Sequence, residues 1–181
     1  MLQTFSRKIL FEWWGFSEKI SEPLPDKCVI ALAPHTSNWD FIVGRLYTTA
    51  IGQSNLFLMK KEWFFWPLGI LMKRIGGIPV YRNKKMNVTD SIAEQARKAD
   101  IFRICVTPEG TRKANSEWKK GFYYIALKAN IPILLYGLDY KTKTIVCTKK
   151  VIPNGNVDDQ LLEIKDYFRD FTGKHPQNFA L

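Results

Sequence analysis

The sequence predicts a single α/β domain built on a mixed, mostly parallel sheet that helices flank. At 181 residues, the chain is long enough to bury one hydrophobic core. Its hydrophobic fraction of 46% and charged fraction of 24% are typical of ordered globular proteins. Short apolar runs alternate along the chain with segments of helical periodicity, and this alternation is typical of strands and helices in a parallel sheet.

The first predicted element is an amphipathic helix that ends near Gly15. Such a helix either lies on a lipid surface or packs against the rest of the domain. Proline and polar residues at 21–26 then break the structure. Residues 1–24 are therefore expected to form a helix and a connector within one domain of residues 1–181. The apolar positions at helical spacing are Leu2, Phe5, Ile9, Leu10, Trp13 and Trp14.

The remaining elements are predicted from apolar runs and helical spacing. Strands are expected at residues 28–33, 55–60, 78–81, 103–106, 131–136 and 144–151. Helices are expected at residues 41–51, 60–74, 88–99, 116–129 and 157–171. Pro79 places its strand at a sheet edge or at a strand start, because proline lacks an N–H. The tail from Gly173 is expected to be an exposed end, and His175 in it has no carboxylate neighbour.

One of the two histidines stands in the stretch Pro34-His35-Thr36-Ser37-Asn38-Trp39-Asp40. A carboxylate behind a histidine holds its tautomer and stabilises the imidazolium, so the pair can take a proton from a hydroxyl near pH 7. Residues five apart on one helix point in different directions. We therefore place His35 in a loop, Ser37 at the N-cap and Asp40 in the first turn. The positive end of that helix would keep the imidazole neutral, as a general base requires.

An alternative interpretation is that Ser37 and Asp40 form only a capping box and that His35 is an ordinary loop residue.

A second polar turn, residues 107–112, also follows an apolar run, and its Gly110 lets the backbone approach a ligand closely. The carboxyl ends of parallel strands meet at one sheet edge, so the two turns are expected to lie together.

The composition indicates a negatively charged partner. Lys and Arg number 27 against 17 Asp and Glu, which gives a formal net charge of +10. A phosphate-bearing substrate, an anionic lipid surface or a nucleic acid would fit this charge. Aromatic clusters at residues 11–16 and 63–66 are typical of the membrane–water interface. No segment approaches the ~20 apolar residues of a membrane span, so the chain is expected to be soluble or to lie on a membrane.

The three cysteines do not predict disulfides or a metal site. Cys28, Cys105 and Cys147 are scattered, and the first two lie in apolar runs. Buried, reduced thiols of a cytosolic protein are expected.

Four sequence blocks in a consistent order resemble the glycerolipid acyltransferase family typified by lysophosphatidic acid acyltransferases. Each block alone is weak, whereas the ordered set is specific and reaches from residue 34 to about residue 136. The resemblance implies a fold like that of glycerol-3-phosphate acyltransferase. The blocks are His35-x4-Asp40, Gly-Ile-Pro-Val-Tyr-Arg at 77–82, Pro-Glu-Gly-Thr-Arg at 108–112 and Ile-Pro-Ile at 131–133.

This resemblance implies acyl transfer from acyl-CoA or acyl carrier protein to the hydroxyl of a lysophospholipid such as lysophosphatidic acid. His35 would be the general base and Asp40 the residue that orients it. The expected location is the inner face of the cytoplasmic membrane, with an anionic membrane surface as partner. No cofactor, metal ion or nucleic acid is expected, because the acyl thioester is a co-substrate. The acceptor side would be formed by Lys61, Arg82, Glu109, Gly110, Thr111 and Arg112.

Departures from the family pattern leave the acceptor open. Pro34 stands where the family often has Asn, and Pro79 and Tyr81 stand where many members carry Phe and an acidic residue. An aminolipid acceptor, a thioesterase that activates water and a non-catalytic lysolipid-binding protein are the alternatives. A nucleic-acid-binding module would explain the charge but not the His35–Asp40 spacing.

Overall fold

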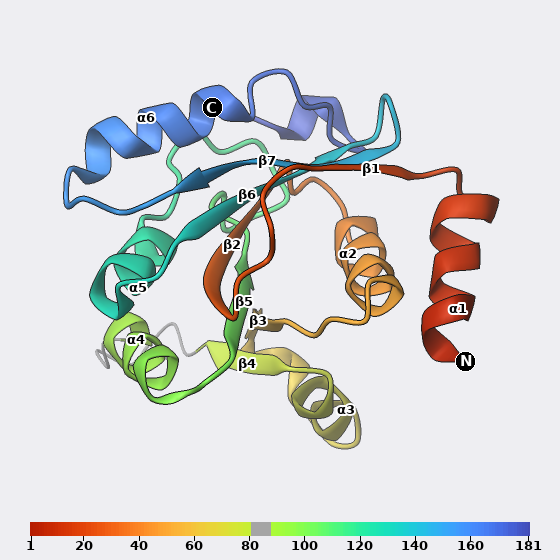
Figure 1. Cartoon of the computed structure of the whole chain (residues 1–181), viewed down its shortest axis with the longest axis horizontal. Helices are drawn as coiled ribbons and strands as arrows, with labels where there is room; N and C mark the ends of the chain where they lie inside the picture. The colour runs from red at the N-terminus through yellow and green to blue at the C-terminus, as the bar shows by residue number, and fades with distance from the viewer. Residues whose placement is uncertain (81–87) are drawn as a thin grey trace.

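Within the residues that the structure describes, 1–80 and 88–181, a seven-stranded mixed sheet carries the fold, as the sequence predicted (Figure 1). The structure is a computed structural model. The strand order is β1-β7-β6-β2-β5-β3-β4, and all neighbours are parallel except β6 and β7. The strands are β1 (Ser17–Ile20), β2 (Lys27–Ala33), β3 (Leu56–Lys60), β4 (Gly77–Val80), β5 (Phe102–Val106), β6 (Ile133–Asp139) and β7 (Thr144–Val151).

Helices cover both faces of this sheet. In Figure 1, α4, α5 and α6 lie on one face, and α1 and α2 lie on the other. The α-helices are α1 (Leu2–Arg7), α2 (Trp39–Ala50), α3 (Leu68–Arg74), α4 (Val88–Lys98), α5 (Gly121–Ala129) and α6 (Val157–Tyr167). The π-helix η1 (Lys8–Trp13) continues α1, and the short 3₁₀ turns are η2 (Lys61–Trp63) and η3 (Pro176–Asn178).

The central strand β2 shows why two cores form. Successive side chains of a strand point to opposite faces. Val29 and Ala31 therefore pack in the core beneath α4, α5 and α6, whereas Cys28 and Ile30 pack in the core beneath α2 and η1. Burial raises the pKa of the Cys28 thiol to about 12, so this cysteine is a neutral, reduced side chain.

Strand direction gives the sheet two different edges. The strands β2, β5, β3, β4 and β6 run parallel, so their carboxyl ends share one edge, which we call the carboxyl edge. Because β7 is antiparallel to β6, its carboxyl end lies at the opposite edge. The strand β1 is parallel to β7, so β1 begins at the carboxyl edge.

The structure corrects several predicted elements. The helix predicted at 60–74 is interrupted, since only η2 and α3 form on either side of Phe64 and Pro67. At Gly69 a Cβ atom would lie 2.5 Å from the carbonyl oxygen of Phe64, so the chain folds back tightly at this point. The helix predicted at 116–129 begins only at 121, and the helix predicted at 157–171 ends at 167. The strand β1 was not predicted, because all its residues are exposed and lack an apolar pattern. Pro79 does lie in an edge strand, β4.

The N-terminal helix packs on the domain and also leaves apolar side chains exposed. Leu10 is fully buried, and the side-chain amide of Gln3 donates to the Ala50 carbonyl oxygen of α2 at 3.3 Å. Leu2 and Trp13 are each 69% exposed. Among the described helices, none combines the length and apolar character that a membrane span requires.

The C-terminal tail is exposed at residues 174–177, as predicted, but it is anchored to the domain at Gly173 and His175. Gly173 is buried, and a Cβ atom on it would lie 2.7 Å from the hydroxyl oxygen of Thr36. The backbone N–H of His175 donates to that same hydroxyl at 3.2 Å. The tail therefore packs directly against the loop that carries His35.

Candidate active site

His35 and Asp40 lie together at the carboxyl edge, on either side of the start of α2. His35 follows β2 in a loop, as predicted, and Asp40 lies in the first turn of α2. The Nδ1 atom of His35 lies 3.1 Å from Oδ2 of Asp40. The side chain of His35 is 19% exposed, whereas that of Asp40 is fully buried. The imidazole can thus meet a substrate while the carboxylate cannot.

The buried carboxylate of Asp40 is fully occupied by donors. Its Oδ2 accepts the backbone N–H groups of Thr36 and Ser37, each at 2.8 Å. Its Oδ1 accepts the hydroxyl of Tyr140 at 2.8 Å. Donors to a carboxylate favour its ionised form, which offsets the cost of burying the charge.

The cap of α2 differs by one residue from the prediction. Asn38 is the N-cap, and the Ser37 hydroxyl accepts the N–H of Trp39 at 3.2 Å. The carboxylate of Asp40 still accepts the Ser37 N–H, as in a capping box. The capping interpretation and the His35–Asp40 pair are therefore both correct, because Oδ2 of Asp40 accepts the Ser37 N–H and also faces His35.

Glu109 connects the second polar turn, residues 107–112, to the loop that carries His35. Its Oε1 accepts the backbone N–H of His35 at 2.8 Å. The residue is 3% exposed, and its Oε2 has no hydrogen-bond partner among the described residues. Burial raises the pKa of Glu109 to about 7, although the His35 N–H opposes this shift. The two turns meet as predicted, and Glu109 contacts the backbone of the histidine loop.

The other predicted acceptor residues have different positions around this edge. Gly110 has a φ of +67°, which glycine adopts without strain, and the turn beyond it exposes Arg112. Thr111 is partly buried. Lys61 is exposed in η2, directly after the carboxyl end of β3. The remaining predicted acceptor residue, Arg82, lies outside the described residues.

Two contributors to the site escaped the sequence analysis. Tyr140 follows β6, which ends at residue 139 and not at residue 136 as predicted. Had the strand been extended, its direction would have placed Tyr140 at the carboxyl edge. Lys174 has its Nζ 4.4 Å from the centroid of the Trp39 ring and 6.0 Å from that of Tyr140. No sequence motif marks this lysine, which lies in the tail predicted to be an exposed end.

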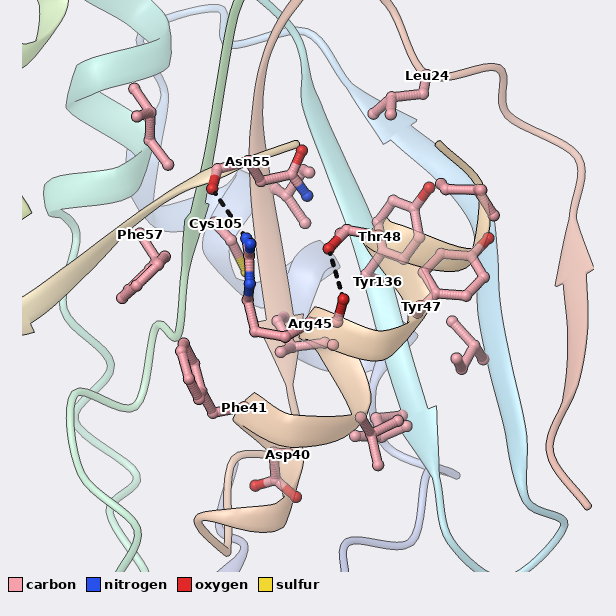
Figure 2. A pocket seen from close by; sticks show the side chains of 18 residues that line it. Leu24, Asp40, Phe41, Arg45, Tyr47, Thr48, Asn55, Phe57, Cys105 and Tyr136 are labelled. Carbon is pink, nitrogen blue, oxygen red and sulfur yellow. Dashed lines mark hydrogen bonds between the residues drawn. The ribbon is translucent and has the colours of Figure 1, made fainter. Parts of the chain in front are cut away.

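An apolar cavity lies between α2 and the sheet, with Asp40 at one end. Its volume is about 720 Å³, including the part open to solvent. Figure 2 shows Asp40 at one end, with Leu24 and Asn55 at the other. The Arg45 guanidinium donates to the Asn55 carbonyl oxygen at 3.5 Å. Apolar and aromatic lining comes from α2, β3 and β6, including Phe41, Val43, Tyr47, Phe57 and Tyr136.

No group of three or more His, Cys, Asp or Glu side chains that could hold a metal ion occurs in residues 1–80 and 88–181. The chemistry that these residues support by themselves is proton transfer at His35.

Comparisons with known proteins give this geometry its family. The sequence model of the family described as Acyltransferase matches residues 16–135. Human 1-acyl-sn-glycerol-3-phosphate acyltransferase beta is 30% identical over 118 residues, which is 59% of this chain and 40% of the human protein. The crystal structure of the 1-acyl-sn-glycerophosphate (LPA) acyltransferase PlsC from Thermotoga maritima has the same fold. It matches with a TM-score of 0.66 and 17% identity, covering 93% of this chain and 75% of that one.

The matched segment begins just before β1 and reaches into β6, so it contains His35, Asp40 and Glu109. The chain therefore belongs to the acyltransferase family.

Proposed function

We propose that this protein transfers a fatty acyl group from a thioester donor to the hydroxyl of a lysophospholipid, converting lysophosphatidic acid to phosphatidic acid. The observation that carries the proposal is the 3.1 Å contact between Nδ1 of His35 and the buried carboxylate of Asp40. An ionised carboxylate only accepts, so Nδ1 carries the proton and Nε2 carries the lone pair. That lone pair makes Nε2 the general base.

In the proposed reaction, Nε2 takes the proton from the acceptor hydroxyl as its oxygen attacks the thioester carbonyl. A tetrahedral intermediate forms and then breaks the carbon–sulfur bond, and the imidazolium returns its proton to the leaving thiolate. Asp40 stabilises the imidazolium between these two transfers. General base catalysis of this kind contributes about 10²–10⁴ in rate. No side-chain nucleophile is required, because the acceptor oxygen attacks directly.

The cavity beneath α2 is the proposed site of the acyl chain. Its apolar and aromatic lining suits a hydrocarbon chain. Asp40 lines one end of it, so a chain in the cavity would have its thioester close to His35. The donor is acyl-CoA or acyl carrier protein.

The cations at the carboxyl edge are the proposed phosphate site. Lys61 and Arg112 are exposed there, and Arg82 follows β4 in the sequence by two residues. Guanidinium groups bind phosphate oxygens in a bidentate manner. We assign Gly110 and Thr111 to the same site because they stand between Glu109 and Arg112 in the turn.

The membrane is the proposed location, at its inner, cytoplasmic face. Exposed tryptophans surround the carboxyl edge: Trp13 precedes β1, Trp39 follows β2 and Trp63 follows β3. Tryptophan favours the membrane–water interface, and a net charge of +10 favours anionic lipid. This arrangement would hold the site against the surface where lysophospholipids reside.

The decisive experiment offers labelled acyl-CoA and acyl-ACP donors with a panel of acceptors, including lysophosphatidic acid and lyso-aminolipids, and identifies the products by mass spectrometry. We expect phosphatidic acid from the wild-type protein and none from a folded His35→Ala variant. Transfer only to an aminolipid would replace the acceptor. Release of free fatty acid without acceptor would make the protein a thioesterase. Wild-type rates in the folded His35→Ala variant would refute the mechanism.

A further inference from the structure

Tyr140 contacts the carboxylate that faces His35, from a segment outside the matched family region. Its hydroxyl donates to Oδ1 of Asp40 at 2.8 Å, although the two residues are 100 positions apart. The other carboxylate oxygen, Oδ2, faces His35 and accepts two backbone N–H groups. Among the described residues, Tyr140 is the donor to Oδ1, so its hydroxyl fixes the position of that oxygen atom.

Two neighbouring segments, the residue before β1 and the chain after α6, hold Tyr140 in place. Its backbone N–H donates to the Thr172 carbonyl oxygen at 2.8 Å. The ring of Phe16 meets it edge-on, with the centroids 5.9 Å apart, and Nζ of Lys174 lies 6.0 Å from its centroid. Burial, followed by the charge of Asp40, raises the pKa of the Tyr140 hydroxyl, so it remains a protonated donor. A fixed donor of this kind can hold the carboxylate in one orientation.

We propose that Tyr140 is a positioning residue for the reaction: it holds the Asp40 carboxylate with Oδ2 toward Nδ1 of His35. The proposal rests on the proposed function of the His35–Asp40 pair. A hydrogen bond to an ionised carboxylate withdraws part of its charge. Tyr140 thereby also limits how strongly Asp40 stabilises the imidazolium, and so keeps His35 a base that can release its proton.

The sign of the effect follows from this charge. Without the Tyr140 donor, the full carboxylate charge of Asp40 acts on the neighbouring imidazole and favours the imidazolium. This change is expected to move the acidic limb of the rate profile to higher pH. The other charged groups around the pair are Glu109 beneath His35 and Lys174 above Trp39 and Tyr140. Glu109 and Lys174 are the same in the wild-type protein and in a Tyr140 variant, so a difference between the two pH profiles reports on the Tyr140 hydroxyl.

The test is Tyr140→Phe, which keeps the ring and the backbone bond and removes only the hydroxyl. We expect kcat to fall about tenfold with little change in KM, since the lost bond acts on the pair and not on substrate. We expect the acidic limb of kcat/KM to move up by about half a pH unit or more. The matched control is Tyr167→Phe, which removes a partly buried hydroxyl bonded to Thr148. It should keep the wild-type kcat and profile.

A second readout does not depend on activity. The chain has two histidines, so His175→Gln leaves His35 as the one imidazole whose ring proton is titrated by NMR. In this background, Tyr140→Phe should raise the measured pKa of His35, and Tyr167→Phe should not. An unchanged pKa with an unchanged kcat would overturn the proposal, as would a loss of thermal stability alone. If the wild-type protein transfers no acyl group, the proposed function fails, and the NMR titration still decides whether Tyr140 acts on the pair.

Discussion

At the residue scale, Glu109 is a buried carboxyl group in the middle of the site. It accepts the His35 N–H through Oε1, and burial raises its pKa from 4.5 to about 7. Between these two pH values the folded protein holds a proton that the unfolded chain has released. Its contribution to stability is therefore fully present below pH 4.5 and is lost as the pH rises through 7.

We predict that Glu109→Gln removes this loss, because glutamine does not ionise and its Oε1 can still accept the His35 N–H. The difference in the free energy of unfolding, variant minus wild type, should therefore be about 2–3 kcal/mol larger at pH 8 than at pH 5. Urea unfolding at both pH values measures the difference. The control is Glu117→Gln at an exposed position, which should change both values equally. The same offset for Glu109→Gln at pH 5 and pH 8 would contradict the expectation.

At the element scale, the helix α2 forms one wall of the apolar cavity and presents its glycine there. Gly44 lines the cavity, and a Cβ atom built on it meets nothing within 4 Å. A larger side chain at this position would therefore occupy cavity space without displacing the backbone.

We predict that Gly44→Leu shifts donor preference toward shorter acyl chains while keeping the rate with a short donor. The substitution also replaces a mid-helix glycine by a better helix former. Helix propensity alone should raise the free energy of unfolding of the variant by about 0.5–1 kcal/mol. Competition among donors of graded length measures the preference. Gly121→Leu, at the start of α5 and equally unobstructed, is the matched control. An unchanged chain-length profile would mean that the acyl chain does not enter this cavity.

At the scale of the whole molecule, strand direction separates two sets of exposed apolar residues. Trp13 and Trp63 lie beside the carboxyl edge and the site. Ile152 follows β7, whose carboxyl end lies at the opposite edge, and it is 59% exposed. Only the first set can touch the surface that the site would face.

We predict that the wild-type protein binds anionic vesicles and that added salt weakens this binding, since charge contributes to it. The double variant Trp13→Ser and Trp63→Ser should bind at least tenfold more weakly, because each buried aromatic ring contributes about 1.5–3 kcal/mol. Vesicle co-sedimentation at two salt concentrations measures both effects. Ile152→Ser combined with Leu162→Ser on α6 is the control and should bind like wild type. Equal losses in both double variants would show that the carboxyl edge has no special role in docking.

The sequence by itself determined the fold class, the order of most elements and the place of His35 and Asp40 in a loop and a first helical turn. These features follow from periodicity and capping, which depend on residues a few positions apart. The four blocks also predicted the family that the comparison over residues 16–135 shows.

The tertiary structure decided what depends on residues far apart in the chain. The polar strand β1 exists because β7 pairs with it. Tyr140 reaches Asp40 across 100 residues, and Gly173 packs on Thr36, because β6 and the tail end at the carboxyl edge. No local pattern encodes such contacts, since they are set by which strands become neighbours in the sheet.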